Sequence, residues 1–180
     1  RDKVGPRDVV LLVDAYDVLL TPSALGIAPR FRALGRPLVF AAERTLWPDA
    51  ALEPHYPPPP PPSFTNATAA TGTMGTTGTA LPGGGAGESE AYPPRFLNSG
   101  TVVGEGWAVR LMLGRLQRMG ALTRCGPDDQ RGFHKFFLEN PELCALDYRG
   151  ELFATLHFLT KPMHVHPGGH VLVGRAPSRD

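Results

Sequence analysis

The chain has 180 residues, and its 21 glycines and 20 prolines amount to nearly twice the ordinary share of about 12 % for these two types. A hydrophobic content of 42 % and the lack of a Gly-X-Y period exclude a fully disordered chain and a collagen triple helix. The formal net charge of +1 gives no electrostatic case for a nucleic-acid partner, and no apolar run approaches the roughly 18 residues of a transmembrane helix. The length suits one domain that carries an insertion.

Strand-like and helix-like segments alternate at the start of the chain. Residues 8–13 form a continuous apolar run followed by acidic residues, which predicts a buried central strand whose C-terminal end opens into a site. Residues 23–34 are expected to form a helix with Ser23 as N-cap and Gly35 as terminator. Residues 36–42 predict a second short strand.

Residues 57–92 are predicted to be a flexible, disordered surface insertion. The stretch 54–94 holds half of the prolines and a third of the glycines, and only two formal charges, Glu88 and Glu90. Such a segment has too little apolar surface to offset its ordering entropy. A passive insertion is the main interpretation, and a Pro-rich ligand for another protein module is the alternative.

A third strand is expected over 99–104, and two helices follow it. The helix over 106–119 carries apolar residues at helical spacing, namely Val109, Met112, Leu113 and Leu116. The helix over 128–138 carries three phenylalanines on one face. Strands that alternate with helices predict an α/β layer fold.

Asp14 and Asp17 are the sharpest candidates for chemistry, because they lie three residues apart directly after the first strand. Two carboxylates in this position can converge on Mg²⁺ or Mn²⁺, which prefer oxygen ligands and share them with substrate phosphates. Open α/β sheets bind ligands at the carboxyl ends of their strands. The alternative is a turn in which Asp14 only caps the following segment.

Two further segments offer polar groups. Asn98 and Ser99 supply hydrogen-bonding side chains, and Gly100 permits a close backbone approach. Asp128 and Asp129 stand at a helix start, where they either accept sugar hydroxyls or simply complement the helix dipole. The alternative for residues 98–100 is a turn without a role in binding.

A histidine-rich segment, 164–170, lies near the end of the sequence and includes His166 and Gly168. Imidazole is an acceptable Mn²⁺ ligand, and glycines let a diphosphate approach the backbone. The alternative is a solvent-facing cluster without a ligand. No P-loop, no Gly-x-Ser-x-Gly elbow, no Cys-x-x-Cys pair and no His-x-Asp/Glu iron motif occurs in the chain.

Taken in order, these segments resemble the glycosyltransferase domain of the procollagen lysyl hydroxylases and, more loosely, the collagen galactosyltransferases. The matching segments are 9–18 (VVLLVDAYDV), 39–43 with Trp47-Pro48, 95–100 (RFLNSG), 128–130 (DDQ) and 146–153 (LDYRGELF). The resemblance implies a GT-A-like, Rossmann-like fold, a UDP-galactose or UDP-glucose donor, and Mn²⁺ or Mg²⁺.

The resemblance also implies roles for individual residues. The metal ligands would be Asp14, Asp17 and His166. The donor would contact Tyr16, Trp47, Asn98, Ser99, Gly100 and Gly168. Asp128 and Asp129 would lie at the reaction centre, where they orient the sugar or stabilise positive charge at its anomeric carbon.

The chain departs from the family at three places. The segment before His166 is shorter, and the family's His-Gly-Asn-Gly stretch is replaced here by His166-Pro167-Gly168-Gly169. The insertion over 57–92 is not a family feature. The N-terminal strands that hold the nucleotide are expected to be missing, so that 1–180 is a partial domain.

Two functions stay open on the sequence. The first is transfer of galactose or glucose from UDP to a hydroxylated protein side chain of the hydroxylysine type. The second is a non-catalytic GT-A-like binding or scaffold domain. The sequon Asn66-Ala67-Thr68 favours the endoplasmic reticulum or secretory pathway, where Cys125 and Cys144 are able to form a bridge.

Overall fold

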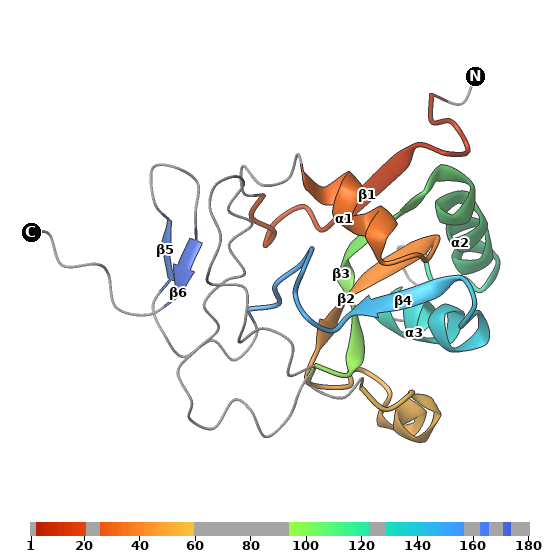
Figure 1. Ribbon diagram of the computed structural model, residues 1–180. Coiled ribbons are helices and arrows are strands. Elements are labelled where there is room, and N and C mark those ends of the chain that lie inside the picture. Colours follow the sequence, from red (N-terminus) through yellow and green to blue (C-terminus); the bar gives the residue numbers. More distant parts are fainter. Residues whose placement is uncertain are drawn as a thin grey trace, which may run out of the picture.

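A mixed four-stranded sheet forms the centre of the fold, with the strand order β1-β3-β2-β4 (Figure 1). The computed structural model describes residues 3–20, 26–59, 94–122, 129–156, 163–165 and 171–173. β1 (Val9–Val13) and β2 (Leu38–Glu43) each pair antiparallel with β3 (Phe96–Glu105), and β4 (Cys144–Asp147) pairs parallel with β2. The predicted α/β class is therefore confirmed for the described residues.

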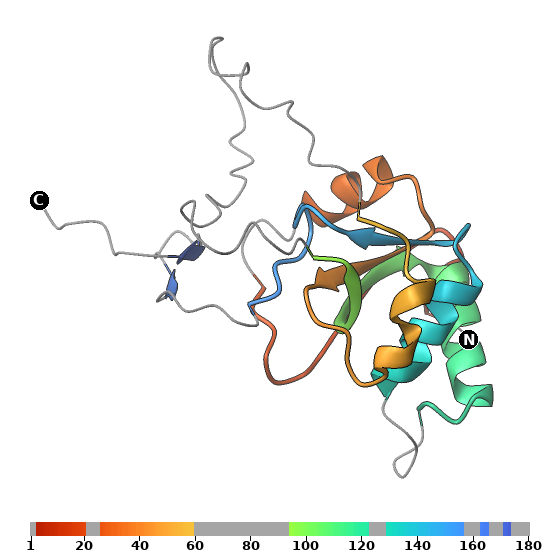
Figure 2. The same cartoon turned by 90° about the horizontal axis from the view of Figure 1, so that it is seen from below.

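Helices cover both faces of this sheet. α1 (Ile27–Ala33) lies on one face, and α2 (Gly106–Arg118) and α3 (Asp129–Glu139) lie on the other (Figure 2). The short 3₁₀ helix η2 (Ala50–His55) lies beside α3. A separate pair of short antiparallel strands, β5 (Met163–Val165) and β6 (Val171–Val173), completes the described elements.

The two cores follow from the period-two alternation of β2. Leu38 and Phe40 belong to the larger cluster beneath α2 and α3, whereas Val39 joins Phe31 of α1 on the opposite face. All three strand residues are fully buried. Because helices cover both faces of the sheet, the sequence of β2 is apolar almost throughout and does not alternate between apolar and polar residues.

The predicted helical faces are confirmed. Val109, Met112 and Leu116 of α2 are buried in the larger core, and Leu113 packs against it. The helix ends at Arg118, and Gly120 follows with a φ of 73°, the left-handed conformation that terminates many helices.

The first strand was predicted to be a buried central strand, and this prediction is wrong. Within the described residues β1 pairs with β3 alone, so it lies at an edge of the sheet, and its side chains are only partly buried. Its apolar run has another cause: Val10 and Leu12 pack against the larger core, while Val9 and Leu11 pack against the smaller one. Coverage of both faces, rather than a central position, explains the sequence.

Other boundaries differ in detail. The third strand begins at Phe96 rather than at residue 99, so the segment predicted to be a turn or sugar site lies inside a strand. α1 ends at Ala33, and Gly35 follows with a φ of 65°, as expected of a terminator. The predicted N-cap Ser23 lies outside the described residues.

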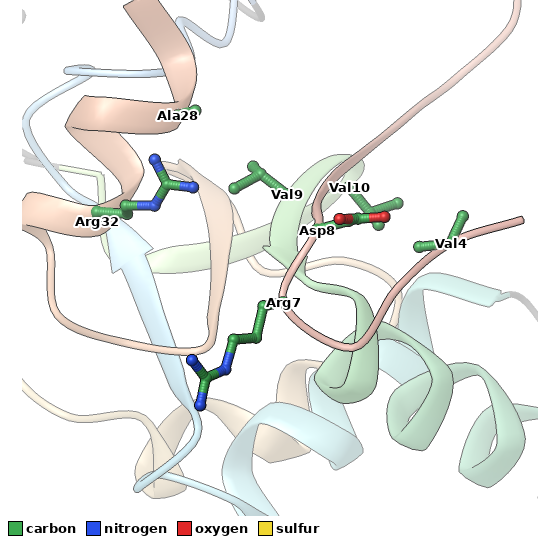
Figure 3. A pocket seen from close by; sticks show the side chains of 7 residues that line it. All are labelled: Val4, Arg7, Asp8, Val9, Val10, Ala28 and Arg32. Atoms are coloured by element: carbon green, nitrogen blue, oxygen red, sulfur yellow. The ribbon is translucent and has the colours of Figure 1, made fainter.

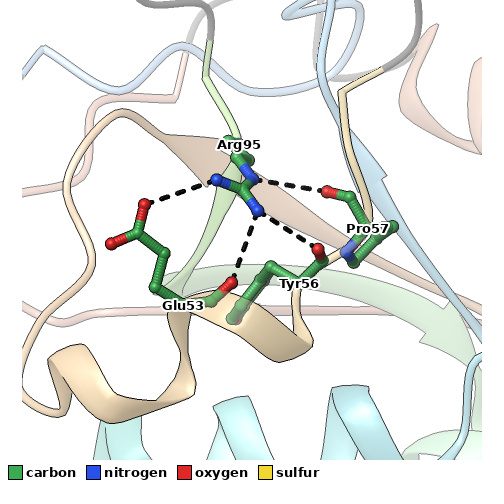
Figure 4. Close-up of polar contacts among 4 residues, drawn as sticks. All are labelled: Glu53, Tyr56, Pro57 and Arg95. Carbon is green, nitrogen blue, oxygen red and sulfur yellow. Dashed lines mark hydrogen bonds and ion pairs between the residues drawn. The ribbon is translucent and has the colours of Figure 1, made fainter.

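The two ends of the predicted insertion are tied together by Arg95. Its guanidinium donates to the carbonyls of Glu53, Tyr56 and Pro57 at 3.2–3.5 Å, and Nη1 lies 3.4 Å from a carboxylate oxygen of Glu53 (Figure 4). The chain thus leaves and re-enters the domain at neighbouring points. Beyond residue 59, the predicted insertion over 57–92 lies outside the described residues.

Candidate functional site

A bulge in β3 creates the site. Phe40 of β2 lies opposite Val102, but the next residue, Ala41, lies opposite Asn98, so residues 99–101 have no register partner on β2. Bulges of this kind bend a strand and redirect its side chains. On the other side of β3, Thr101 still pairs with Val13 of β1.

The end of β1 is fixed to this bulge. The backbone N–H of Asp14 donates to the carbonyl of Gly100 at 2.9 Å, and the N–H of Gly100 donates to Oδ1 of Asn98 at 3.0 Å. A Cβ on residue 100 would lie 2.9 Å from Oδ2 of Asp14 and 3.1 Å from Oδ1 of Asn98. Residue 100 must therefore be a glycine for both side chains to approach so closely.

Two other carboxylates act electrostatically on Asp14, at the end of β1 beside the bulge. The side chain of Asp14 keeps contact with solvent, yet the desolvation that it does undergo, together with the negative charges of Asp17 and Asp129, raises its pKa. Asp129 is the first residue of α3, and its Oδ1 accepts the N–H of Gln130 at 2.8 Å. The fold thus brings together carboxylates that are far apart in the sequence.

The chemistry of these donors fits a hard divalent cation. Carboxylate oxygens are the ligands that Mg²⁺ and Mn²⁺ prefer, and a cation would offset the mutual repulsion that raises the pKa of Asp14. Across the part of the chain that the structure describes, no group of three or more aspartate, glutamate, histidine or cysteine residues is placed so that it could hold a metal ion. The third predicted ligand, His166, lies outside the described residues, as do Asp128 and Gly168.

Glu43, at the end of β2, organises the predicted sugar-binding residues. Its carboxyl group is buried, with 6 % exposure of the residue, and its two oxygens accept from Asn98 Nδ2 at 3.4 Å and Gln130 Nε2 at 2.8 Å. Gln130 in turn accepts the hydroxyl of Ser99 at 3.2 Å. One buried acidic residue therefore connects β2, the bulge of β3 and the start of α3.

Glu43 and Gln130 are site residues that the sequence prediction missed, although both fall inside the segments that carry the family resemblance. The sequence does contain a signal for Glu43, because it is the only charged residue at the end of an otherwise apolar strand, 38–43. An acidic residue in that place is buried only when donors surround it.

The two predicted aromatic residues lie on loops. Tyr16 follows β1 and is fully exposed, and the side chain of Trp47 is 60 % exposed in the loop after β2. The carbonyl of Trp47 accepts from Gln130 Nε2 at 2.9 Å and from His134 Nε2 at 2.8 Å. The loop of Trp47 is thereby tied to the same helix that begins at Asp129.

The LDYRGELF segment has a structural explanation. The buried carboxylate of Asp147 accepts the backbone N–H groups of Glu151, Leu152 and Phe153 at 2.7–2.9 Å. These bonds close the turn that follows β4. Asp147 is therefore occupied in holding this turn.

Cys144 is a free thiol buried in β4. Burial raises its pKa to about 12, so the thiol has little nucleophilic character at neutral pH. The other cysteine of the predicted bridge, Cys125, lies outside the described residues.

A shallow, open hollow of about 540 Å³ lies between β1 and α1 (Figure 3). Its lining includes Arg7 and Arg32 together with apolar residues of β1. None of the predicted site residues lines it.

Two comparisons with known proteins found matches for this sequence. The model of the family described as the PLOD GT domain matches residues 2–76, a range that contains β1, the two aspartates after it and the Trp47 loop. Over these residues the chain is therefore similar to the PLOD GT domain. A procollagen-lysine,2-oxoglutarate 5-dioxygenase of Drosophila melanogaster is 28 % identical over 160 residues, which cover 86 % of this chain.

These matches confirm the resemblance read from the sequence. The aligned part is 17 % of the Drosophila protein, so the chain spans only a small share of that relative. In the described residues, every helix is too short or too polar to cross a membrane.

Proposed function

We propose that this domain transfers galactose or glucose from a UDP-sugar to a hydroxylated protein side chain of the hydroxylysine type, and that transfer depends on Mn²⁺ or Mg²⁺. The observation that supports the proposal most strongly is the electrostatic effect of Asp17 and Asp129 on Asp14, which is hydrogen-bonded through its backbone to Gly100 in the β3 bulge. Such a cluster suits a site where a cation and a diphosphate are bound together.

In this proposal Asp14 and Asp17, with His166, hold the cation. When bound, the cation supplies positive charge that stabilises the leaving diphosphate. The rigid support for these ligands comes from the chain itself, because the Asp14 N–H is fixed to Gly100 and the position of Gly100 depends on Asn98.

The sugar is assigned to the start of α3. Glu43 and Gln130 orient the side chains of Asn98 and Ser99. The residues at the start of α3 then contact the transferred hexose. Asp128 or Asp129 orients that sugar or stabilises the positive charge that develops at its anomeric carbon. Tyr16 and Trp47 are assigned to the nucleotide.

Turnover of UDP-galactose and UDP-glucose by the full-length protein tests the proposal. We expect activity that requires Mn²⁺ and that Asp14→Ala and Asp17→Ala each reduce strongly, since each variant removes one ligand. Lys3→Ala, outside the site, serves as the control. Unchanged turnover in both aspartate variants would refute the metal assignment.

A non-catalytic binding or scaffold domain is the second candidate. It is favoured by the replacement of the family's His-Gly-Asn-Gly stretch with His166-Pro167-Gly168-Gly169. Calorimetry with UDP and Mn²⁺ separates the two candidates, because a scaffold domain that has lost the site shows no affinity for this pair. For either function we propose the endoplasmic reticulum or secretory pathway as the location.

A further inference from the structure

His134 is a buried polar residue that the proposed chemistry does not use. It lies on α3, it has no solvent exposure, and its ring meets the ring of Tyr56 edge-on with centroids 5.7 Å apart. A buried imidazole needs partners for both ring nitrogens, and the identity of these partners indicates what the residue does.

The two partners fix the direction of the hydrogen bonds. Nε2 lies 2.8 Å from the carbonyl oxygen of Trp47, and because a carbonyl only accepts, Nε2 must donate. Nδ1 of the neutral imidazole then accepts from the hydroxyl of Tyr56. That hydroxyl accepts the backbone N–H of Leu97 at 3.4 Å, and burial raises the pKa of Tyr56, which keeps its donor proton in place.

A single chain of hydrogen bonds therefore leads from the backbone of β3 to the loop of Trp47. The ring of Tyr56 is held in turn, since it stacks on Phe137 with centroids 5.5 Å apart and meets Phe96 edge-on. Every member except Trp47 is a buried part of the core. This series of hydrogen bonds thus attaches an otherwise exposed loop to the buried core and restricts its motion.

Two neighbouring residues of α3 hold the same loop. Gln130 donates to the carbonyl of Trp47 at 2.9 Å, and Arg131 pairs with Asp49 at 3.0 Å. Together with His134, they attach the loop to the first five residues after Asp129. The Trp47 loop and the start of α3 therefore form one mechanical unit.

We infer that His134 is a positioning residue, which holds the Trp47 loop in a fixed place relative to Asp129 so that the nucleotide and the sugar are bound in register. This inference rests on the proposed function for its consequence in binding. The positioning itself is a property of the chain and is measurable without any nucleotide.

The test compares two substitutions of similar size in the 180-residue chain. His134→Leu removes both ring nitrogens, whereas His134→Gln retains a donor near the position of Nε2. Both are made in a Trp107→Phe background, so that Trp47 is the single tryptophan. Time-resolved fluorescence anisotropy then reports the local motion of Trp47, and circular dichroism verifies the fold.

We expect a larger fast component of the Trp47 anisotropy decay in His134→Leu and recovery towards the parent value in His134→Gln. In the full-length protein, the affinity for UDP with Mn²⁺ is expected to fall by up to about tenfold in His134→Leu, the usual range for one lost hydrogen bond. A folded His134→Leu chain with unchanged Trp47 anisotropy would overturn the inference, as would equal loosening in both variants.

A second measurement needs no variant and therefore does not depend on the folding of His134→Leu. Long-range ¹H–¹⁵N correlation spectra of the parent chain report which ring nitrogen of His134 is protonated. We expect a proton on Nε2, and an unprotonated Nε2 would refute the bond to Trp47. Lack of UDP–Mn²⁺ binding by the full-length parent would instead refute the proposed function, while the anisotropy would still decide the role of His134.

Discussion

Replacing Glu43 by glutamine tests the buried network at the centre of the site. The carboxyl group of Glu43 accepts from Gln130 at 2.8 Å and from Asn98 at 3.4 Å. A glutamine at this position has one acceptor oxygen and one NH₂ group, so one of the two donors loses its acceptor. The side-chain amides of Gln130 and Asn98 cannot rotate by half a turn to restore the lost bond, because Gln130 also donates to Trp47 and Asn98 also accepts from Gly100.

The expected cost follows from this geometry. One buried donor without an acceptor costs about 2 kcal/mol, which corresponds to a fall in Tm of roughly 6 °C for a domain of this size. Thermal and urea unfolding, both followed by circular dichroism, measure it. Glu139→Gln is the matched control, since Glu139 is exposed and 3.9 Å from Arg115, and its loss is expected to cost no more than about 0.5 kcal/mol. Equal effects of the two substitutions would refute the network.

Three further predictions test other parts of the account. Asp14→Asn should slightly stabilise the metal-free chain at pH 7. The pKa of Asp14 is raised by folding, so the folded chain binds more protons than the unfolded chain. The stability of the parent chain therefore falls as the pH rises from the ordinary aspartate pKa of about 3.9 towards the raised pKa. Urea unfolding at pH 4 and 7 measures this. Gly106→Ala should destabilise by about 2 kcal/mol, because its Cβ would lie 2.2 Å from the carbonyl oxygen of Gly5. Gly114→Ala in the same helix should stabilise by up to about 1 kcal/mol, because its Cβ would make only an ordinary contact, 3.6 Å from Nη1 of Arg118. Cys144 should resist thiol reagents at pH 8 until the chain is unfolded, because burial raises its pKa to about 12.

Each of these expectations has a contrary result. A less stable Asp14→Asn chain at pH 7 would show that the carboxylate of Asp14 is stabilised in the fold rather than repelled. Equal effects of the two glycine substitutions would contradict the close approach at Gly106. Rapid labelling of Cys144 in the native chain would contradict its burial.

Much of the fold was predictable from local patterns. The apolar spacing of α2 and the phenylalanines of α3 marked their buried faces because helical periodicity records burial directly. The sequence carries no comparable signal for the order of the strands in the sheet. The run of β1 looks like a central strand because both of its faces are covered, although it pairs with one neighbour among the described residues.

The candidate site was predictable in part. Asp14, Asp17 and Asn98 stood out by residue type and by their position beside the ends of the predicted strands. Glu43 and His134 did not, because their importance depends on partners that are distant in the sequence: Glu43 meets Gln130 across 87 positions, and His134 meets Tyr56 across 78. The bulge in β3 was also invisible, because the register against β2 is a property of the pairing rather than of one strand.

The central claim is that Asp14 and Asp17 bind a divalent cation together with a UDP-sugar, and electron paramagnetic resonance of Mn²⁺ tests it directly. The signal of free Mn²⁺ is followed while the full-length protein is titrated in the presence of UDP, with the Asp14→Asn, Asp17→Asn double variant as the comparison. The account predicts that the native protein with UDP removes the free Mn²⁺ signal and that the double variant leaves it in place. Equal loss of the signal in both proteins would contradict the account.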